Sequence, residues 1–307
     1  MDKILVTGYH NIDLDGAACA YAYTELLNQL GSPAVFGISG SLEVEPSYVF
    51  KKLNLKALNA DKILCPKTKI IICDASESRW LSKNINPLQV IEVIDHRTIN
   101  EVEVFKNAKV QIAEVGACAT LIAERFEQEK VTPSRESATA LFLAIVSNTI
   151  NFMSSLTTKR DINEAIFLKE LYCIPDTFIH EMFVYKSTIK NSVIKVLEED
   201  LNHYTFNGMK ICVLQLEIVD ASNFISRNIT AISDALINFK NLYKYDCILL
   251  SCIDIEKGGN TFIAVDSETK VLLKDILGLK FKLNISRRSG VIMRKQLLPK
   301  IKQYFEK

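Results

Sequence analysis

The sequence carries almost no excess charge, because 37 Lys and Arg residues are balanced by 36 Asp and Glu residues over 307 positions. Such a balance gives no general attraction to nucleic acid or to an anionic membrane. It excludes proteins that bind polyanions through net charge, so phosphate recognition would have to come from a local basic cluster. We expect no nucleic-acid partner.

Long apolar runs and paired cysteines are also missing. No stretch approaches the ~20 apolar residues that a membrane span needs, and Met1-Asp2-Lys3 leads into a short apolar segment without a signal-peptide pattern. None of the eight cysteines forms a CxxC pair, and most lie in apolar stretches, which is typical of reduced, buried thiols in a cytosolic protein. We therefore expect a soluble, untargeted cytoplasmic protein with no membrane partner.

The first half of the chain alternates short β-branched runs with helical patterns. Strands are expected at 4–7, 34–38, 70–73, 90–94 and 110–113, and helices at 15–30, 46–53, 117–128, 135–145, 160–170 and from 177 onward. Such alternation predicts an α/β fold with a parallel, Rossmann-like sheet covered by helices.

A second, smaller α/β domain with a mixed sheet is expected after the helical stretch, since the length exceeds that of a usual single domain. Strands are expected at 204–206, 211–216, 248–253 and 262–265, with a helix at 222–239 and a hairpin turn at Gly258-Gly259-Asn260. The predicted domains are residues 1–189 and 190–307.

Acidic side chains follow three of the expected strands at the point where each strand ends. They are Asp13 and Asp15 after the first strand, Asp74 after the strand at 70–73, and Asp95 after the strand at 90–94. Because open α/β sheets bind ligands at the carboxyl ends of their strands, we expect these groups to converge. Converging carboxylates repel one another unless a cation lies between them, and imidazole suits a transition metal better than calcium. A metal site is predicted; independent helix caps are the alternative.

Two histidines and a basic cluster complete this interpretation. His10 and His96 fall on the same predicted edge, and Asp95 is expected to orient the ring of His96, leaving its other nitrogen for a metal. Arg287-Arg288, Arg294-Lys295 and Lys300 concentrate positive charge near the end of the chain, where they either hold phosphate oxygens or form a solvated helix face. A metal site facing basic residues is typical of phosphoryl chemistry, with the active site expected between the domains.

At these positions the chain resembles the DHH phosphoesterase superfamily, within it the family II (manganese-dependent) inorganic pyrophosphatases and the exopolyphosphatase/prune proteins. The resemblance spans nearly the whole length, and several motifs in the right order make it specific. The motifs are Gly8-Tyr9-His10-Asn11-Ile12-Asp13-Leu14-Asp15, Ile72-Cys73-Asp74, Glu92-Val93-Ile94-Asp95-His96-Arg97, Val115-Gly116-Ala117-Cys118-Ala119-Thr120, Ser147-Asn148-Thr149 with Phe152 and Thr157-Thr158, and Gly290 with Gln296-Leu297-Leu298-Pro299.

The resemblance implies a two-metal hydrolase of phosphoanhydride bonds. Asp13 would ligate one metal, Asp15 and His96 the other, and Asp74 would bridge them. It also implies that Arg294 and Lys295 bind terminal phosphates, and we add Arg97 and Arg288 to the expected substrate ligands. The expected catalytic residues are Asp15, Asp74, His96 and Arg97, and the expected cofactor is Mn²⁺, or Mg²⁺ or Co²⁺, with one or two ions per chain.

The chain departs from the pyrophosphatase pattern at several of these positions. The pyrophosphatases carry His where this chain has Tyr9, Asp where it has Asn148, a second His where it has Arg97, and a substrate Lys near Asn202 and His203. Arg97 matches the DHR variant of the exopolyphosphatase/prune branch. His10 and the carbonyl oxygen of Asn148 are the expected compensating metal ligands.

These inferences predict a hydrolase of pyrophosphate or short polyphosphate. One alternative is a catalytically weakened relative that binds phosphate compounds or a protein. Another is a phosphodiesterase of cyclic dinucleotides or short oligonucleotides, although Gly258-Gly259-Asn260 lacks the histidine of the Gly-Gly-Gly-His-type loop found in that branch. A short exposed strand in the first domain is a candidate contact for a homodimer.

Overall fold

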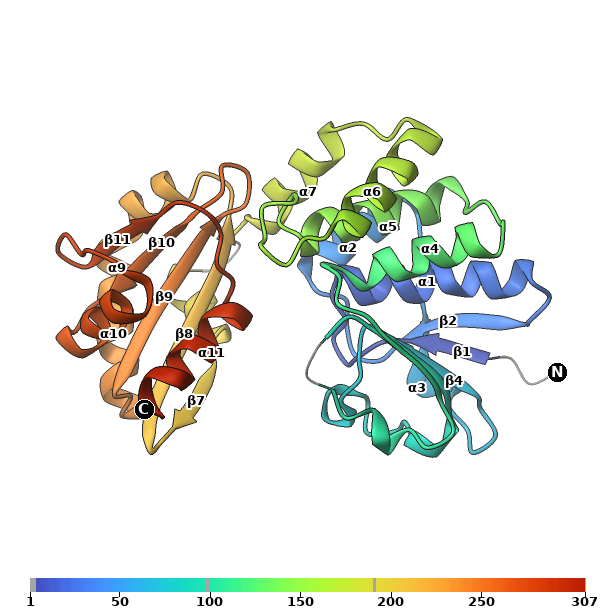
Figure 1. Ribbon diagram of the computed structural model, residues 1–307, viewed down its shortest axis with the longest axis horizontal. Coiled ribbons are helices and arrows are strands. Elements are labelled where there is room, and N and C mark those ends of the chain that lie inside the picture. Colours follow the sequence, from blue (N-terminus) through green and yellow to red (C-terminus); the bar gives the residue numbers. More distant parts are fainter. Residues whose placement is uncertain (1–3, 98–99, 190–191, 307) are drawn as a thin grey trace. The chain divides into compact units, whose positions relative to one another are not determined.

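The computed structural model describes residues 4–97, 100–189 and 192–306. The chain divides into two compact units (Figure 1): unit 1 holds Met1–Phe152 and Leu156–Tyr185, and unit 2 holds Met153–Ser155 and Lys186–Lys307. The predicted boundary between residues 189 and 190 touches 190–191, which lie outside the described residues, as do residues 1–3.

Unit 1 is built on a six-stranded parallel sheet in the order β3-β2-β1-β4-β5-β6. The strands are β1 (Ile4–Thr7), β2 (Ala34–Ile38), β3 (Leu58–Asn59), β4 (Ile70–Cys73), β5 (Val90–Asp95) and β6 (Lys109–Ile112). The central strands β1 and β4 are almost wholly buried, as the strands of a sheet covered on both faces must be. The predicted parallel, helix-covered sheet is confirmed.

The helices of unit 1 position the strand ends. They are α1 (Leu14–Gln29), α2 (Val44–Lys52), α3 (Ala60–Ile63), α4 (Cys118–Gln128), α5 (Arg135–Asn148), α6 (Lys159–Tyr172) and α7 (Thr177–Lys186), with 3₁₀ turns at Ser78–Trp80, Pro87–Gln89 and Val102–Val104. Helix α1 begins where the Asp13 carboxylate accepts the N–H of Gly16, and the chain turns after it at Gly31, whose φ is +78°. Helix α1 packs against α4 and α5.

The order of the strands marks where a ligand site is expected in unit 1. The chain runs outward from β1 through β2 to β3 and then returns to β4 on the other side of β1. In open α/β sheets, such a reversal of strand order opens a ligand-binding crevice at the carboxyl ends of the two strands. The residues that follow β1 and β4 therefore face the same space.

Unit 2 has a five-stranded mixed sheet in the order β11-β10-β9-β8-β7, in which only β8 and β9 are parallel among the pairs the structure describes. Its elements are α8 (Val193–Glu199), β7 (His203–Phe206), β8 (Met209–Ile218), α9 (Ala221–Tyr243), β9 (Cys247–Asp254), β10 (Asn260–Ala264), α10 (Ser267–Leu277), β11 (Ile285–Arg288) and α11 (Arg294–Phe305). The predicted mixed sheet is confirmed, and β9 and β10 form the predicted hairpin.

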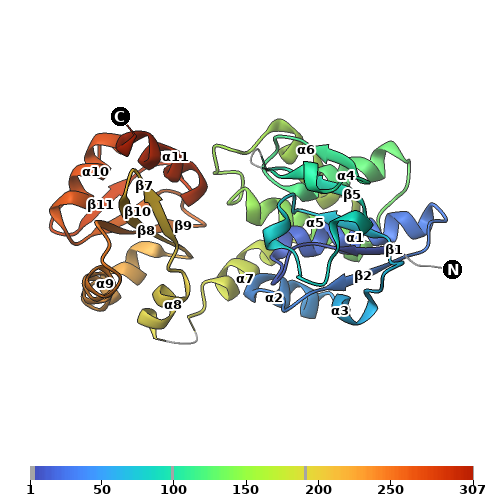
Figure 2. The same ribbon diagram turned by 90° about the horizontal axis from the view of Figure 1, so that it is seen from below.

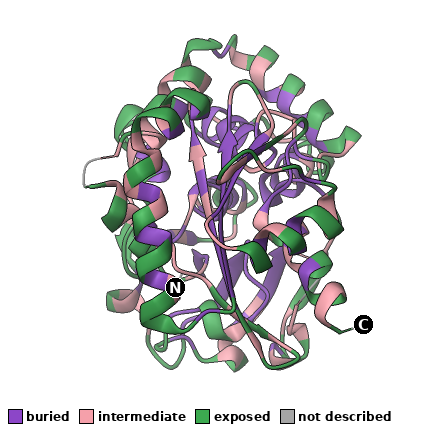
Figure 3. Cartoon of the chain, turned by 90° about the vertical axis from the view of Figure 1, so that its left-hand side faces the viewer, coloured by how far each residue is buried: buried purple, intermediate pink, exposed green. Residues whose placement is uncertain are grey.

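Both faces of this second sheet are covered. Alternate residues of β8 and β9 pack against α9 on one face, and the residues between them pack with α10 and α11 on the other. Figure 2 shows α9 end-on, on the opposite side of the sheet from α10 and α11. Figure 3 shows buried residues along the strands and exposed residues on the outer faces of the helices. Unit 2 thus has cores of its own.

Within the described residues, none of the helices combines the length and apolar character that a bilayer crossing requires.

Candidate metal centre

The carboxyl ends of three strands in unit 1 gather the predicted acidic residues. Asp74 follows β4 directly, Asp95 ends β5 and precedes His96, and Asp13 and Asp15 lie at the start of α1, which follows β1. The order β1-β4-β5 makes these strands neighbours, as predicted. The sheet therefore brings side chains that are distant in the sequence to one edge.

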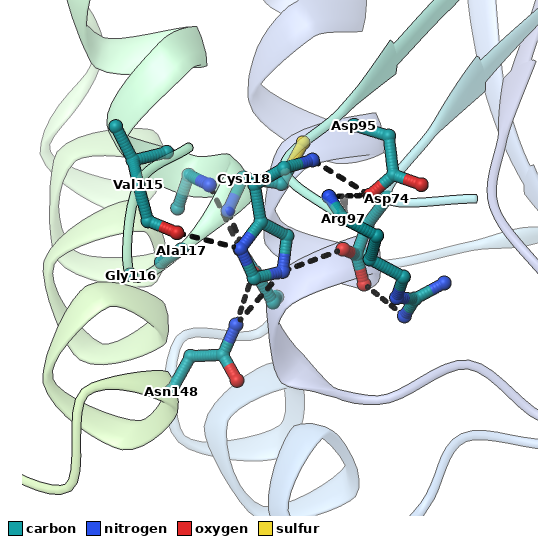
Figure 4. Close-up of polar contacts among 12 residues, drawn as sticks. Asp74, Asp95, Arg97, Val115, Gly116, Ala117, Cys118 and Asn148 are labelled. Carbon is teal, nitrogen blue, oxygen red and sulfur yellow. Dashed lines mark hydrogen bonds and ion pairs between the residues drawn. The ribbon is translucent and has the colours of Figure 1, made fainter. Parts of the chain in front are cut away.

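Three of these side chains form one group. Atoms of Asp15, Asp74 and His96 all lie within 4.8 Å of one another, and all three residues are buried. Nε2 of His96 is 3.4 Å from Oδ1 of Asp74 and 3.8 Å from Oδ2 of Asp15. Figure 4 shows Asp74 beside Arg97, with Asn148 approaching the site from a different element. Two carboxylates and one imidazole thus point at a common centre.

A main-chain carbonyl sets the orientation of the His96 ring. Nδ1 lies 2.9 Å from the carbonyl oxygen of Val115, which only accepts hydrogen bonds, so Nδ1 carries the proton and Nε2 keeps its lone pair for the group. The prediction that Asp95 orients this ring is wrong. The Asp95 carboxylate accepts the backbone N–H of His96 at 2.7 Å and of Arg97 at 3.3 Å, and the hydroxyl of Ser76. Asp95 therefore shapes the turn after β5.

Asp15 is held by the start of α4. Its carboxylate accepts the backbone N–H groups of Cys118 and Ala119, each at 2.8 Å, and the amide nitrogen of Asn148 at 2.7 Å. Ala117, which precedes α4, has no side chain that caps the helix, so Asp15 supplies the missing acceptor from α1. A helix N-terminus also favours the charged form of this carboxylate.

Burial works against that charge. It raises the pKa of Asp15 to about 7, with Asp74 adding to the rise and His96 lowering it. Burial, again with the charge of Asp74, also raises the pKa of Asp13 to about 6, while the N–H of Gly16 lowers it. A divalent cation among these carboxylates would reverse the repulsion and favour their charged forms.

The chemistry of the donor set fits a transition metal. Carboxylate oxygen together with imidazole nitrogen suits manganese or cobalt, whereas calcium sites use oxygen alone. Two thiols lie nearby, but burial raises the pKa of Cys118 to about 12 and that of Cys19 well above its ordinary value. They therefore stay protonated, and the Cys19 thiol donates to Oδ1 of Asp15 at 3.6 Å. The group fits one divalent cation.

Arg97 lies on the other side of Asp74. Its Nη2 is 3.4 Å from Oδ2 of Asp74, and its guanidinium carbon lies 5.5 Å from the centre of the Tyr9 ring. The hydroxyl of Tyr9 accepts the backbone N–H of Asp13 at 3.2 Å. Asp74 itself has a left-handed backbone with a φ of 56°, which aspartate tolerates better than most residues. The sequence did not predict the contact between Tyr9 and Arg97. It showed only that both positions depart from the pyrophosphatase pattern.

Some predicted ligands stand apart from the group. Among the residues described, the three-membered group includes neither His10 nor Asp13. His10 is exposed, and its ring lies so close to Gly40 that a Cβ added there would come within 2.8 Å of Cε1. Asn148 directs its nitrogen, rather than the expected carbonyl oxygen, toward Asp15, and this nitrogen is 3.4 Å from Nε2 of His96. The structure therefore gives no support to His10 or to the Asn148 oxygen as a ligand.

Three of the four predicted phosphate-binding residues, all except Arg97, lie in unit 2. Arg294 opens α11, and its Nη1 contacts both carboxylate oxygens of Asp200, at 3.0 and 2.8 Å. Lys295 is exposed on the same helix, and Nη1 of Arg288 donates to the carbonyl of Gly290 at 2.9 Å. The pairing with Asp200 was not predicted, and the roles of these basic residues toward phosphate stay predictions.

Unit 1 thus combines a helix-covered parallel sheet with a buried group of possible metal ligands at its edge. Residues 3–145 match the family described as "DHH family, N-terminal domain", the family that the motifs of the chain resemble.

More particular similarities extend over the whole chain. It is 29% identical to the manganese-dependent inorganic pyrophosphatase of Methanothrix thermoacetophila, over 100% of this chain and 99% of that protein. It is 28% identical to a Clostridium acetobutylicum protein assigned the same activity, over 99% of each. A solved structure from Methanococcus jannaschii, assigned to the family II inorganic pyrophosphatases, shares the fold with a TM-score of 0.74 at 24% identity, covering 98% of this chain and 99% of that one.

Proposed function

We propose that this protein is a manganese-dependent hydrolase of phosphoanhydride bonds, with inorganic pyrophosphate as its substrate. The observation that carries the proposal is the buried group of Asp15, Asp74 and His96 at the carboxyl ends of neighbouring strands. The two relatives similar over the whole chain, named for manganese and for pyrophosphate, support the same activity. The enzyme is therefore a hydrolase acting on acid anhydrides.

Each residue of the group would supply one ligand to the metal. Asp15 and Asp74 offer carboxylate oxygens and His96 offers Nε2, while Val115 keeps the ring turned toward the group. When bound, the metal supplies Lewis acidity at a phosphoryl oxygen and makes water a stronger nucleophile. The N–H groups of Cys118 and Ala119 keep Asp15 in place.

Basic side chains contribute to the charge that phosphates require. The side chain of Arg97 is 33% exposed although its partner Asp74 is buried, so the guanidinium reaches both solvent and the group. A guanidinium stays charged and offers a planar set of donors that suits phosphate oxygens. We propose that Arg97 holds the phosphate next to the metal, that Arg294 and Lys295 bind phosphate as the resemblance implies, and that Arg288 binds it as well.

Phosphate release from pyrophosphate and from tripolyphosphate, measured with added MnCl₂, tests this proposal. We expect turnover of pyrophosphate that is lost in Asp74→Asn, which keeps the size and backbone preference of the side chain but removes its charge. Asp176→Asn, which alters an exposed ion pair with Lys169, is the matched control and should retain full activity. Absence of turnover in the wild type, or equal turnover in Asp74→Asn, would contradict the proposal.

A catalytically weakened phosphate binder is the second candidate. It is favoured by Asn148, which directs nitrogen toward Asp15, and by Tyr9, whose ring contacts Arg97 where the pyrophosphatases carry histidine. In that case calorimetry would detect pyrophosphate binding to the manganese-loaded protein, while no phosphate would be released.

We also propose that the protein is a cytoplasmic homodimer. Strand β6 is an edge of the sheet in unit 1, and its residues Lys109 and Val110 are exposed. An exposed edge is able to pair with another strand. Sedimentation velocity of the wild type and of Val110→Pro, which removes a backbone donor from that edge, tests the dimer. A monomeric wild type would contradict it.

A further inference from the structure

The two carboxylate oxygens of Asp74 face different nitrogen-bearing side chains. Oδ1 lies 3.4 Å from Nε2 of His96, on the side of the three-membered group, and Oδ2 lies 3.4 Å from Nη2 of Arg97. A carboxylate that bridges two metal ions uses its two oxygens in the same divided way. In this chain, the guanidinium of Arg97 already places a positive charge beside Oδ2.

Arg97 is fixed in this place by several contacts. Its backbone N–H donates to Asp95, its guanidinium lies over the ring of Tyr9, and Asp74 is its ion-pair partner. Its charge also acts on the carboxylate of Asp13. The guanidinium is therefore held beside Oδ2 of Asp74.

The surroundings of Asp13 are also occupied. Its Oδ1 accepts the N–H of Gly16 at 3.0 Å and so caps α1, and its backbone N–H donates to the hydroxyl of Tyr9. Tyr9 offers no imidazole nitrogen at this position. A second metal beside Oδ2 of Asp74 would have to displace the guanidinium, and Tyr9 would offer it a phenol in place of a nitrogen ligand.

We propose that the guanidinium of Arg97 takes the place of a second metal ion, so that each chain binds one Mn²⁺, at Asp15, Asp74 and His96. This inference rests on the proposed metal-dependent function. A guanidinium keeps its charge at every physiological pH and cannot dissociate from the protein. Close to Asp74 it also repels a second dication, since like charges within a few ångströms oppose each other strongly at a partly buried site.

Metal stoichiometry tests the proposal without reference to activity. The wild type, stripped with a chelator, loaded with MnCl₂ and freed of excess metal, is expected to hold one Mn²⁺ per chain by elemental analysis and one site by calorimetry. Its electron paramagnetic resonance spectrum should lack the signature of two coupled ions. Two ions per chain would overturn this inference and leave the hydrolase intact, whereas no bound Mn²⁺ would overturn both.

Variants of Arg97 test the cause. Arg97→His removes the fixed charge and adds an imidazole, so we expect a second Mn²⁺ and a coupled-ion spectrum. Arg97→Lys keeps the charge and is the matched control, with one Mn²⁺ expected. Far-ultraviolet circular dichroism confirms that each variant is folded. If folded Arg97→His still binds a single ion, or Arg97→Lys binds two, the fixed charge does not set the stoichiometry and the proposal fails.

Discussion

At the scale of single residues, Asn148 places an amide nitrogen where a metal ligand would be of use. The nitrogen donates to Oδ2 of Asp15 and lies close to Nε2 of His96, so it uses lone pairs that the metal also needs. A donor in this position holds the ligands in place and competes with the cation at the same time. The affinity for Mn²⁺ therefore depends on this one side chain.

We predict that Asn148→Asp binds Mn²⁺ more tightly than the wild type, by about tenfold, because a carboxylate adds a ligand where the amide had only donors. Calorimetric titration of the metal-free protein measures the change. Asn148→Leu, which removes the hydrogen bond without adding a ligand, serves as the control and should bind more weakly than the wild type. A weaker or unchanged affinity in Asn148→Asp would argue against this role.

A second residue-scale prediction concerns Glu164 on α6. Burial raises the pKa of this carboxyl to about 7, and Glu127 and Glu124 contribute to the rise. An unfolded glutamate titrates near its ordinary value, so the folded protein holds the extra proton between about pH 4.5 and pH 7. Stability is then fully present below this range and falls as the pH rises through it.

Glu164→Gln removes this titration. We expect equal stability of the two proteins near pH 4.5 and a more stable variant at pH 8, by about 1 kcal/mol after allowance for solvent screening. Urea unfolding at the two pH values measures the difference. Equal stability at pH 8, or a variant less stable there, would show that the carboxyl titrates normally.

At the scale of elements, one buried carboxylate joins α6 to the start of α4. Asp161 accepts the backbone N–H groups of Gly116 and Ala117, at 2.8 and 3.3 Å, and the hydroxyl of Thr120 at 2.6 Å. It also accepts the N–H and the hydroxyl of Thr158, which completes a capping box. The start of α4 also donates hydrogen bonds to Asp15. The contacts of Asp161 therefore help to fix the position of a metal ligand.

We predict that Asp161→Asn lowers the free energy of unfolding by about 3 kcal/mol, because an amide nitrogen would face donors that now meet a carboxylate. Urea unfolding followed by the fluorescence of Trp80 gives the measurement. The control is Asp176→Asn at an exposed ion pair, where little change is expected. A loss of less than about 1 kcal/mol would contradict the supporting role of Asp161.

The strands show how much of the fold the sequence predicts. Strands β1, β2 and β4 have the predicted bounds, because a continuous apolar run is decisive for a strand buried on both faces. Strands β3 and β11 were not predicted. The two residues of β3 are exposed, and β11 ends in two arginines, so tertiary pairing with β2 and β10 decides their conformation.

The same contrast holds for the site. Asp15, Asp74 and His96 were predicted because each follows a strand that the sequence makes evident. The carbonyl of Val115 and the N–H of Cys118 were not assigned their roles, since every residue has these groups and no side chain marks them. The sequence therefore predicts which side chains gather, whereas their orientation depends on main-chain groups that only the folded chain brings near.

At the scale of the whole molecule, the metal group belongs to unit 1 alone, and unit 2 has its own cores. A ligand stabilises only the folded state that binds it, by about 2.7 kcal/mol at one hundred times its Kd. We predict two calorimetric transitions, of which only that of unit 1 rises in temperature with added MnCl₂. The single tryptophan, Trp80, lies in unit 1 and identifies this transition by its fluorescence.

Asp74→Asn provides the control, since its unit 1 transition should not respond to MnCl₂. Removal of the metal with a chelator should return the wild type to its original transition temperature. If both transitions of the wild type move together by the same amount, the two units unfold as one and the prediction is wrong.

The segment Met153–Ser155 belongs to unit 2 although the chain on either side of it belongs to unit 1. Within unit 2, the hydroxyl of Ser154 donates to the sulfur of Met293, and Gln296 donates to Ser155 at 2.5 Å. A gene divided after Tyr185, where unit 2 resumes, would therefore give a second product that lacks these serines. A single crossover therefore cannot exchange unit 2 as a whole, so the coding sequences of the two units are expected to be inherited together.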